Sequence, residues 1–289
     1  MSVNIILNST SRHFAKSFAN KNFRVFTSGT NKDGKYIFPD GEVYARLDNI
    51  EKIKGRTIII HSGAPDPSGG LVELEMLLSI LRQQRVKPIE IFFTYFPYGR
   101  QDKSFLPGEA NTVKDILDKL TKYYQVRRIY IVDPHFGHRD WLKNYPVRKI
   151  SAFKLFKDTI VKKYPGILFL SADNGQAERS GISGAKKKRA NSFEVKFQLG
   201  DIFRKIKGKN ICLVDDLIET GGTLVKLAAE CRRLGAKKII VFVTHGVLLE
   251  GIERVSAHVD EFYTTNSIGQ RKFRLDIGGL IGESISKRR

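Results

Sequence analysis

The apolar residues of this chain gather in short runs, and several segments between those runs carry apolar residues at helical spacing. Short apolar runs bounded by turn-forming residues are typical of buried strands, whereas an apolar residue every three or four positions is typical of a helix. The runs predict strands at residues 3–7, 56–61, 89–95, 128–132, 167–170, 211–214 and 239–244. Helices are predicted at residues 11–19, 71–81, 112–122, 151–163, 224–234 and 248–256, the first of them capped by Ser9 or Thr10.

One unit of strand, helix and strand occurs twice. Residues 55–94 and 208–244 share a glycine before the first strand, a Gly-Gly pair before the helix and a threonine ending the second strand, at an offset of about 153 residues. The repeat predicts an α/β protein of two similar domains, each a mainly parallel sheet flanked by helices. We expect the domains at residues 1–147 and 148–272, with the tail, about residues 273–289, packing back onto the first.

The second copy carries the clearer chemistry. Its predicted strand runs into Asp215 and Asp216, and the turn at residues 220–223, Thr-Gly-Gly-Thr, precedes the helix. Backbone N–H groups in a glycine-rich turn at a helix N-terminus bind anionic oxygens, and the two acids can hold sugar hydroxyls or a hydrated cation. A Gly-Gly turn alone fits any α/β protein, but the preceding acids favour a ligand loop. The first copy has Ser62 and Gly63 at the positions of the acids.

Other polar segments are predicted to follow strands or to project from the fold. Residues 38–44 contain proline and glycine and predict a projecting hairpin. Arg100 lies in a loop after one strand, His135 and His138 follow another, and Asp173 follows a third. Open α/β sheets place ligands at the carboxyl ends of their strands, so these side chains are candidates for phosphate, nucleotide or metal contacts. A surface hairpin and solvated loops without function are the alternatives.

The segment at residues 181–190 is glycine-rich and then densely basic. Most charge runs are solvated loops, but this one could also be a lid that brings Lys187 and Arg189 onto a polyphosphate. The whole chain has 50 Lys and Arg against 30 Asp and Glu, a net charge of +20, which favours anionic partners. An RNA or DNA binder is therefore a second class of hypothesis, although no nucleic-acid-binding module is evident.

The two cysteines, Cys212 and Cys231, lie in apolar contexts and are expected to be reduced core thiols. No stretch approaches the roughly 20 apolar residues that a membrane-spanning helix requires, and no signal sequence is evident. We expect a cytoplasmic protein that does not bind membranes.

Five segments, in the order in which they occur, resemble the ribose-phosphate pyrophosphokinases, also called phosphoribosyl pyrophosphate synthetases. They are Phe38-Pro-Asp-Gly-Glu42, Arg100-Gln-Asp102, Asp133-Pro-His135, Ser171-x-Asp173-x-Gly175, and Asp215-Asp216 with the Thr220–Thr223 turn. The last segment alone also fits type I phosphoribosyltransferases, so the ordered set carries the resemblance. It implies transfer of the β,γ-diphosphoryl group of ATP to the 1-hydroxyl of ribose 5-phosphate, for nucleotide biosynthesis, by a homo-oligomer that uses Mg²⁺.

The resemblance also implies a role for each matching residue. ATP is expected to contact Phe38, Asp40, Gly41, Glu42, Arg100, Gln101, Asp102 and His135. Ribose 5-phosphate is expected to contact Arg189, Asp215, Asp216, Glu219, Thr220, Gly221, Gly222 and Thr223. Catalysis is assigned to Lys187 and Arg189, and the metal to His135 and Asp173.

The chain departs from the family pattern at Glu219, where many relatives have Asp or Ser, and in the residues beside His135 and Asp173. A type I phosphoribosyltransferase and a non-catalytic regulatory subunit of the synthetase are the alternative interpretations. The former does not need the duplicated first half of the chain. The latter has no reason to retain the basic lid and the paired acids.

Overall fold

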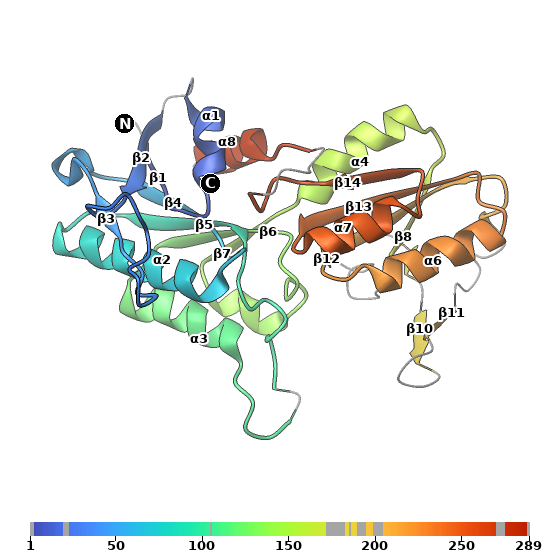
Figure 1. Ribbon diagram of the computed structural model, residues 1–289, viewed down its shortest axis with the longest axis horizontal. Coiled ribbons are helices and arrows are strands. Elements are labelled where there is room, and N and C mark those ends of the chain that lie inside the picture. The colour runs from blue at the N-terminus through green and yellow to red at the C-terminus, as the bar shows by residue number, and fades with distance from the viewer. Residues whose placement is uncertain are drawn as a thin grey trace. The chain divides into compact units, whose positions relative to one another are not determined.

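The structure is a computed structural model that describes residues 3–19, 23–104, 106–171, 183–184, 186–189, 195–198, 205–269 and 275–287. The chain divides into two compact units (Figure 1). Unit 1 comprises residues 1–150, 267–269 and 277–289, and unit 2 comprises residues 151–266 and 270–276. Both units are α/β, as the sequence predicts. No helix among the described residues is long and apolar enough to cross a membrane.

Unit 1 is built on a seven-stranded sheet in the order β3-β2-β1-β4-β5-β6-β7. Its strands are β1 (Val3–Leu7), β2 (Phe23–Gly29), β3 (Arg46–Leu47), β4 (Thr57–Ser62), β5 (Ile89–Tyr95), β6 (Arg128–Val132) and β7 (Val147–Ile150). All neighbours are parallel except β2 and β3. The carboxyl ends of six strands therefore share one edge of the sheet, and their amino ends share the opposite edge.

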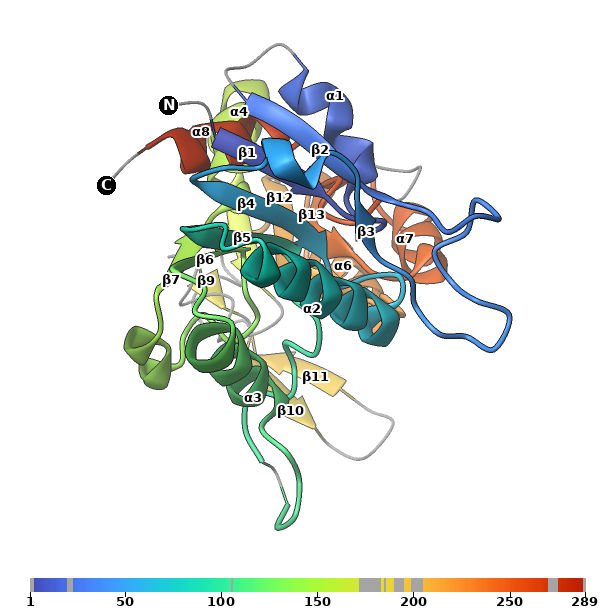
Figure 2. The ribbon, with the colours of Figure 1, turned by 90° about the vertical axis from the view of Figure 1, so that its left-hand side faces the viewer.

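Helices cover both faces of this sheet (Figure 2). On one face lie α2 (Pro67–Gln83) and α3 (Thr112–Asp118), the latter continued by a π-helical turn (Lys119–Tyr123). On the other lie α1 (Ala15–Phe18), which follows a 3-10 turn (Arg12–Phe14), and α8 (Gly278–Ser286). Two further 3-10 turns occupy Ile50–Lys52 and Asp140–Asn144.

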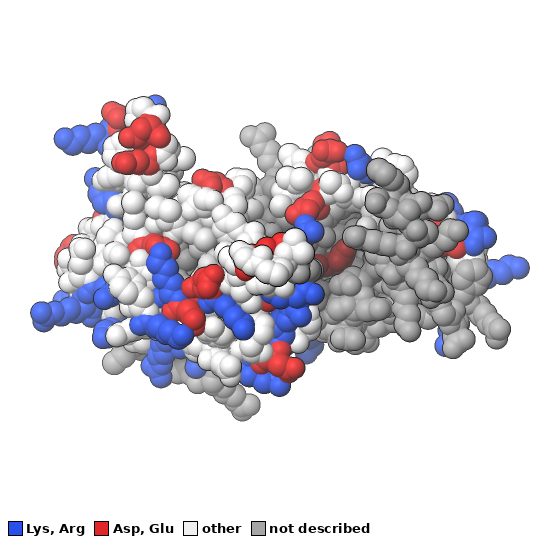
Figure 3. All heavy atoms as spheres, turned by 90° about the horizontal axis from the view of Figure 1, so that it is seen from below, with Lys and Arg blue, Asp and Glu red and all other residues white. Residues whose placement is uncertain are grey.

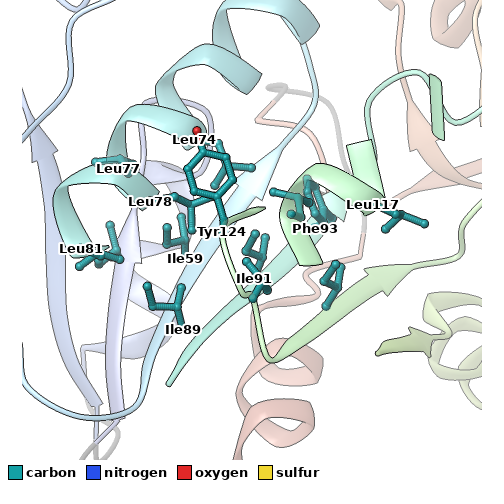
Figure 4. Close-up of a cluster of buried hydrophobic side chains, with 14 of the residues drawn as sticks. Ile59, Leu74, Leu77, Leu78, Leu81, Ile89, Ile91, Phe93, Leu117 and Tyr124 are labelled. Atoms are coloured by element: carbon teal, nitrogen blue, oxygen red, sulfur yellow. The ribbon is translucent and has the colours of Figure 1, made fainter. Parts of the chain in front are cut away.

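The core between the sheet and α2 explains the apolar runs (Figure 4). Alternate strand residues, such as Ile59 and Ile91, face the leucine stripe of α2, while their neighbours Ile58, Ile60 and Phe92 are equally buried. A strand that is covered on both faces of the sheet has a continuous apolar sequence, because the side chains on neither face contact water.

Unit 2 has a five-stranded, wholly parallel sheet in the order β14-β13-β12-β8-β9. Its strands are β8 (Leu168–Ser171), β9 (Ser183–Gly184), β12 (Asn210–Ile218), β13 (Lys238–Gly246) and β14 (Glu261–Thr264). One core joins the sheet to α6 (Gly222–Arg233) and α7 (Leu249–Ser256), and another joins it to α4 (Ala152–Lys163). A separate antiparallel pair consists of β10 (Lys186–Arg189) and β11 (Val195–Gln198).

Some local features differ from the sequence predictions. Neither Ser9 nor Thr10 caps the first helix, because the Ser9 hydroxyl donates to Glu73 and the Thr10 hydroxyl donates to Asn8. Strand β12 continues four residues beyond its predicted end at Val214, since it pairs with β13 as far as Ile218. Strand β7 was not predicted, because it has no continuous apolar run.

Candidate active site

The turn after β12 has the geometry of an anion-binding loop. Gly221 has a φ of +72° and is the N-cap of α6. A Cβ atom at Gly221 would lie 2.6 Å from Cγ2 of Val255, so both the backbone conformation and the packing require glycine. At Gly222 a Cβ would meet no atom of the described residues within 4 Å, so none of them closes the first turn of α6 on that side. Among the described residues no side chain caps this helix, and its first turn has no acidic residue, so its N-terminal amides suit an anionic ligand.

Helix α7 holds this turn from behind. A Cβ at Gly251 would lie 1.8 Å from the carbonyl oxygen of Glu219, so the helix backbone packs directly against the turn. The Arg254 guanidinium donates a hydrogen bond of 3.1 Å to the carbonyl oxygen of Thr220 and pairs with Glu250 at 2.8 Å. The sequence analysis did not identify Gly251 and Arg254 as residues that support the turn. Gly251 could have been noticed because it lies inside a predicted helix, where a glycine lowers helix stability and usually indicates close packing.

The two acids occupy the last part of β12. Asp215 is half-buried, and its Oδ1 accepts a hydrogen bond of 2.9 Å from the backbone N–H of Asp216. Asp216 is only 2% exposed. Of the two carboxylates, Asp215 is therefore the more open to a ligand.

In unit 1, the loops after β5 and β6 meet at the carboxyl edge of the sheet. The rings of Phe96 and Phe136 lie 5.0 Å apart, edge to face, and Nε of Arg139 lies 2.5 Å from Oδ2 of Asp102. Asp102 is 3% exposed, so its carboxylate is directed at Arg139 within the protein. Arg100 is exposed in the same loop and can reach a ligand.

Two further candidates flank this pair. Gln101 is exposed, and its Oε1 accepts a hydrogen bond of 2.5 Å from the Thr112 hydroxyl. His135 is half-buried after β6, next to the buried Phe136. The backbone N–H of Asp133 donates to Ile150 at 2.9 Å, which fixes the start of this loop. The two loops are thus tied to the sheet and to each other, with polar side chains at their surface.

The segment at residues 38–44 forms the predicted projecting hairpin. Phe38 N–H donates to the Glu42 carbonyl at 2.8 Å, Gly41 has a φ of +94°, and Oδ1 of Asp40 accepts from Glu42 N–H at 3.1 Å. The Phe38 ring is 38% exposed and packs edge-on against Tyr44, with ring centroids 5.7 Å apart. An exposed aromatic ring held this way offers a surface on which a flat heterocycle can stack.

The remaining candidates are described only in part. Asp173 lies outside the described residues. Lys187 and Arg189 lie in β10, where they pair with Phe197 and Val195 of β11, so this basic segment has strand backbone. Among the described residues, no group of three His, Cys, Asp or Glu side chains could hold a metal ion.

Comparisons with known proteins find related sequences and a similar fold. Residues 4–124 match the sequence model of the N-terminal domain of ribose phosphate pyrophosphokinase, and residues 172–270 match that of the phosphoribosyl transferase domain. A ribose-phosphate pyrophosphokinase of Thermococcus kodakarensis is 33% identical, covering 94% of this chain and 96% of the relative. That of Pyrococcus abyssi is 36% identical, covering 83% and 85%. The crystal structure of phosphoribosylpyrophosphate synthetase from Mycobacterium smegmatis has a TM-score of 0.81 over 98% of both chains at 24% identity, which shows the same fold.

Proposed function

The chain belongs to the ribose-phosphate pyrophosphokinase family and has that activity, and from this premise we propose which of its residues hold each substrate. In the proposed reaction, the 1-hydroxyl oxygen of ribose 5-phosphate attacks the β-phosphorus of ATP. The bond from that phosphorus to the bridging oxygen of the α-phosphate breaks, so that AMP leaves and phosphoribosyl pyrophosphate forms. Such a transfer depends on positioning and charge neutralisation more than on covalent help from the protein.

Unit 2 holds ribose 5-phosphate in this proposal, and the turn at Gly221 and Gly222 is the observation that carries it. The 5-phosphate accepts hydrogen bonds from the uncapped amides at the start of α6, together with the hydroxyls of Thr220 and Thr223. Asp215 accepts hydrogen bonds from the ribose hydroxyls. Asp216 and Glu219 are proposed to support the ribose from the same edge, although Asp216 is the more buried acid.

Unit 1 holds ATP. The exposed Phe38 ring stacks on adenine, and the hairpin backbone at Asp40, Gly41 and Glu42 supplies polar groups around it. Arg100 and Gln101 contact the nucleotide from the loop after β5. The burial of Asp102 against Arg139 changes its proposed role. We infer that it positions the loop instead of touching ATP.

Mg²⁺ fits this chemistry, because it is bound through one or two carboxylates together with substrate phosphates and water, without a dedicated protein cage. His135, half-buried at the carboxyl end of β6, and Asp173 are the side chains proposed to hold it, partly through water. When bound, Mg²⁺ neutralises the phosphate oxygens.

Lys187 and Arg189 are the proposed catalytic residues. Two cations brought onto the transferring diphosphoryl group stabilise the charge that develops on its oxygens, and each such contact is worth roughly 2 to 4 kcal/mol in a transition state. Arg189 also contacts the ribose phosphate in this proposal. We further propose a homo-oligomer in the cytoplasm, without membrane or nucleic-acid partners.

An assay of AMP release tests the activity directly. Purified protein with Mg²⁺, ATP and ribose 5-phosphate is expected to release AMP in step with phosphoribosyl pyrophosphate. A phosphoribosyltransferase would consume phosphoribosyl pyrophosphate instead. Absence of AMP with several divalent metals would overturn the proposal.

A second assay tests the lid. Lys187→Ala is expected to lower kcat by about 100-fold or more while the affinity for ATP stays within a few fold, since the lysine acts on the transferring group. Unchanged kcat would remove Lys187 from the catalytic set.

A further inference from the structure

Strand β5 contains a bulge just before the loop that we propose to contact ATP. His61 of β4 lies opposite Phe93, but the next residue of β4, Ser62, lies opposite Tyr95. Thr94 is therefore the extra residue on β5. A bulge bends its strand and changes the direction of the residues that follow, and bulges are frequent beside active sites. The residues that follow this bulge form the proposed nucleotide loop.

The hydroxyl of Thr94 bonds this bulge to a distant segment of the chain. It donates to the carbonyl oxygen of Ser267 at 2.7 Å and to that of His61 at 3.3 Å. Both Thr94 and Ser267 are fully buried. Because a hydroxyl has a single hydrogen, the shorter contact is the main hydrogen bond. Thr94 therefore holds the backbone of Ser267 against the carboxyl end of β5.

Ser267 is the residue at which the chain re-enters unit 1. The chain passes from unit 2 to unit 1 between Asn266 and Ser267. Within unit 2, the Thr265 hydroxyl donates to the carbonyl oxygen of Thr244 at 2.7 Å, near the carboxyl end of β13. Thr94 and Thr244 occupy corresponding positions in the two copies of the repeat. Each of these threonines therefore anchors one side of the crossing within its own unit.

The far end of the nucleotide loop is also held in place. The backbone N–H of Val113 donates to the carbonyl oxygen of Gln101 at 3.2 Å. The side-chain amide of Asn111 donates to the carbonyl oxygen of Asp102 at 3.2 Å. The exposed Arg100 lies between these bonds and the bulge, so its position depends on both ends of the loop.

We propose that Thr94 is a positioning residue for ATP binding. Its hydroxyl holds the bulge against Ser267 and thereby directs the loop so that Arg100 reaches the nucleotide. Thr94 is fully buried, so it acts through the loop and not by touching ATP. This role rests on the proposed function, which places ATP contacts in this loop.

A series of substitutions at one position tests the hydroxyl. Thr94→Val removes it and keeps a branched side chain of nearly the same shape, Thr94→Ser keeps it, and Thr94→Cys keeps a weaker donor. Thr264→Val is the matched control, because Thr264 is buried at the end of β14 and its hydroxyl forms no hydrogen bond within the described part of the chain. Calorimetry of the full chain gives the Kd for α,β-methylene ATP, and steady-state kinetics give the KM for each substrate, well below the melting temperature of each variant.

The four substitutions do not change the charge of the protein. On the face shown in Figure 3, Lys and Arg side chains lie among Asp and Glu side chains, and all of these charges stay as they are. Charge at the surface attracts a charged substrate over a distance. Since that attraction is the same in every variant, a change in ATP binding reports the position of the loop.

We expect Thr94→Val to raise the Kd for the analogue and the KM for ATP about tenfold, because a buried hydrogen bond is lost and the loop shifts. Thr94→Cys should lie between Thr94→Val and the wild type, whereas Thr94→Ser and the control should stay within about twofold of the wild type. The KM for ribose 5-phosphate should change little in any variant, since the proposed ribose-phosphate turn lies in unit 2.

Unchanged analogue binding in Thr94→Val would overturn the proposal. So would equal losses for ATP and ribose 5-phosphate, which indicate a general loss of structure. A loss in Thr94→Ser as large as in Thr94→Val would also overturn it, because the hydroxyl would then not matter. Arg100→Gln tests the ATP site separately. If Arg100→Gln weakens analogue binding and Thr94→Val does not, only the role of Thr94 fails, whereas if neither does, the proposed ATP contacts of this loop fail as well.

Discussion

Replacement of Gly251 by alanine tests whether α7 positions the turn that we propose to hold ribose 5-phosphate. A Cβ at this position would lie 1.8 Å from the Glu219 carbonyl oxygen and 2.7 Å from its carbonyl carbon. A carbon atom approaches a carbonyl oxygen to no less than about 3.3 Å, so the helix or the turn must move by about 1.5 Å. Because the obstacle is backbone, no side-chain rotation can absorb the change.

The displacement should appear mainly in the use of ribose 5-phosphate. A misplacement of about 1 Å at a substrate contact can cost about 100-fold in rate, so we expect kcat/KM for ribose 5-phosphate to fall about 100-fold, or about 2.7 kcal/mol. Overpacking also destabilises the fold, by about 1 to 3 kcal/mol. The KM for ATP should change little, since the proposed ATP residues lie in unit 1.

Steady-state kinetics with each substrate varied in turn, well below the melting temperature, separate these effects. Gly279→Ala in α8 is the matched control, because its Cβ would meet no atom of the described part of the chain within 4 Å. It should leave the kinetics unchanged and stability equal or slightly higher. If Gly251→Ala retains kcat/KM for ribose 5-phosphate within about twofold, α7 does not position the turn.

Asp102→Asn and Arg139→Met should each raise the KM for ATP and destabilise unit 1 by about 1 to 3 kcal/mol. In melting experiments the double variant should lose less stability than the sum of the two single losses, and additive losses would exclude a coupled pair. Burial would raise the pKa of Glu261, but hydrogen bonds from Lys163 and two tyrosines lower it to about 2. Its contribution to the free energy of unfolding, about 1 kcal/mol after solvent screening, is therefore present above about pH 4.5 and lost as the pH falls toward 2. The urea midpoint of Glu261→Gln should accordingly depend less on pH across that range than the midpoint of the wild type. Gly63→Ala should destabilise unit 1 by about 1 to 3 kcal/mol in the same assay, because its Cβ would lie 2.5 Å from the Pro97 nitrogen. An unchanged urea midpoint would show that the loop at Pro97 moves aside without loss of stability.

Local patterns predicted those parts of the fold that depend on local residues. Buried strands such as β5 were predicted to the residue, because coverage on both faces leaves a continuous apolar run. The turn at residues 220–223 was predicted because its two glycines follow a buried strand and the two acids, and the backbone of Gly221 has the positive φ that favours glycine. What the sequence did not predict depends on partners far along the chain. The support of this turn by Gly251 is one example, and the burial of Asp102 by Arg139 is another.

The two copies of the repeat differ in what occupies the helix N-terminus, and this difference explains why only one binds a phosphate in our proposal. In the first copy, Asp66 caps α2 by accepting a hydrogen bond of 2.9 Å from Gly69 N–H, and Pro67, which has no N–H, follows it. A carboxylate of the chain thus already fills the anion position.

In the second copy the N-cap of the helix is Gly221, which has no side chain to occupy that position. The acids differ for a steric reason as well, because Gly63 lies against Pro97 where the second copy has room for Asp216. The first copy therefore cannot regain a ribose-phosphate loop by acquiring the acids alone. It would also need to lose the Asp66 cap and move Pro97, which lies at the start of the proposed nucleotide loop.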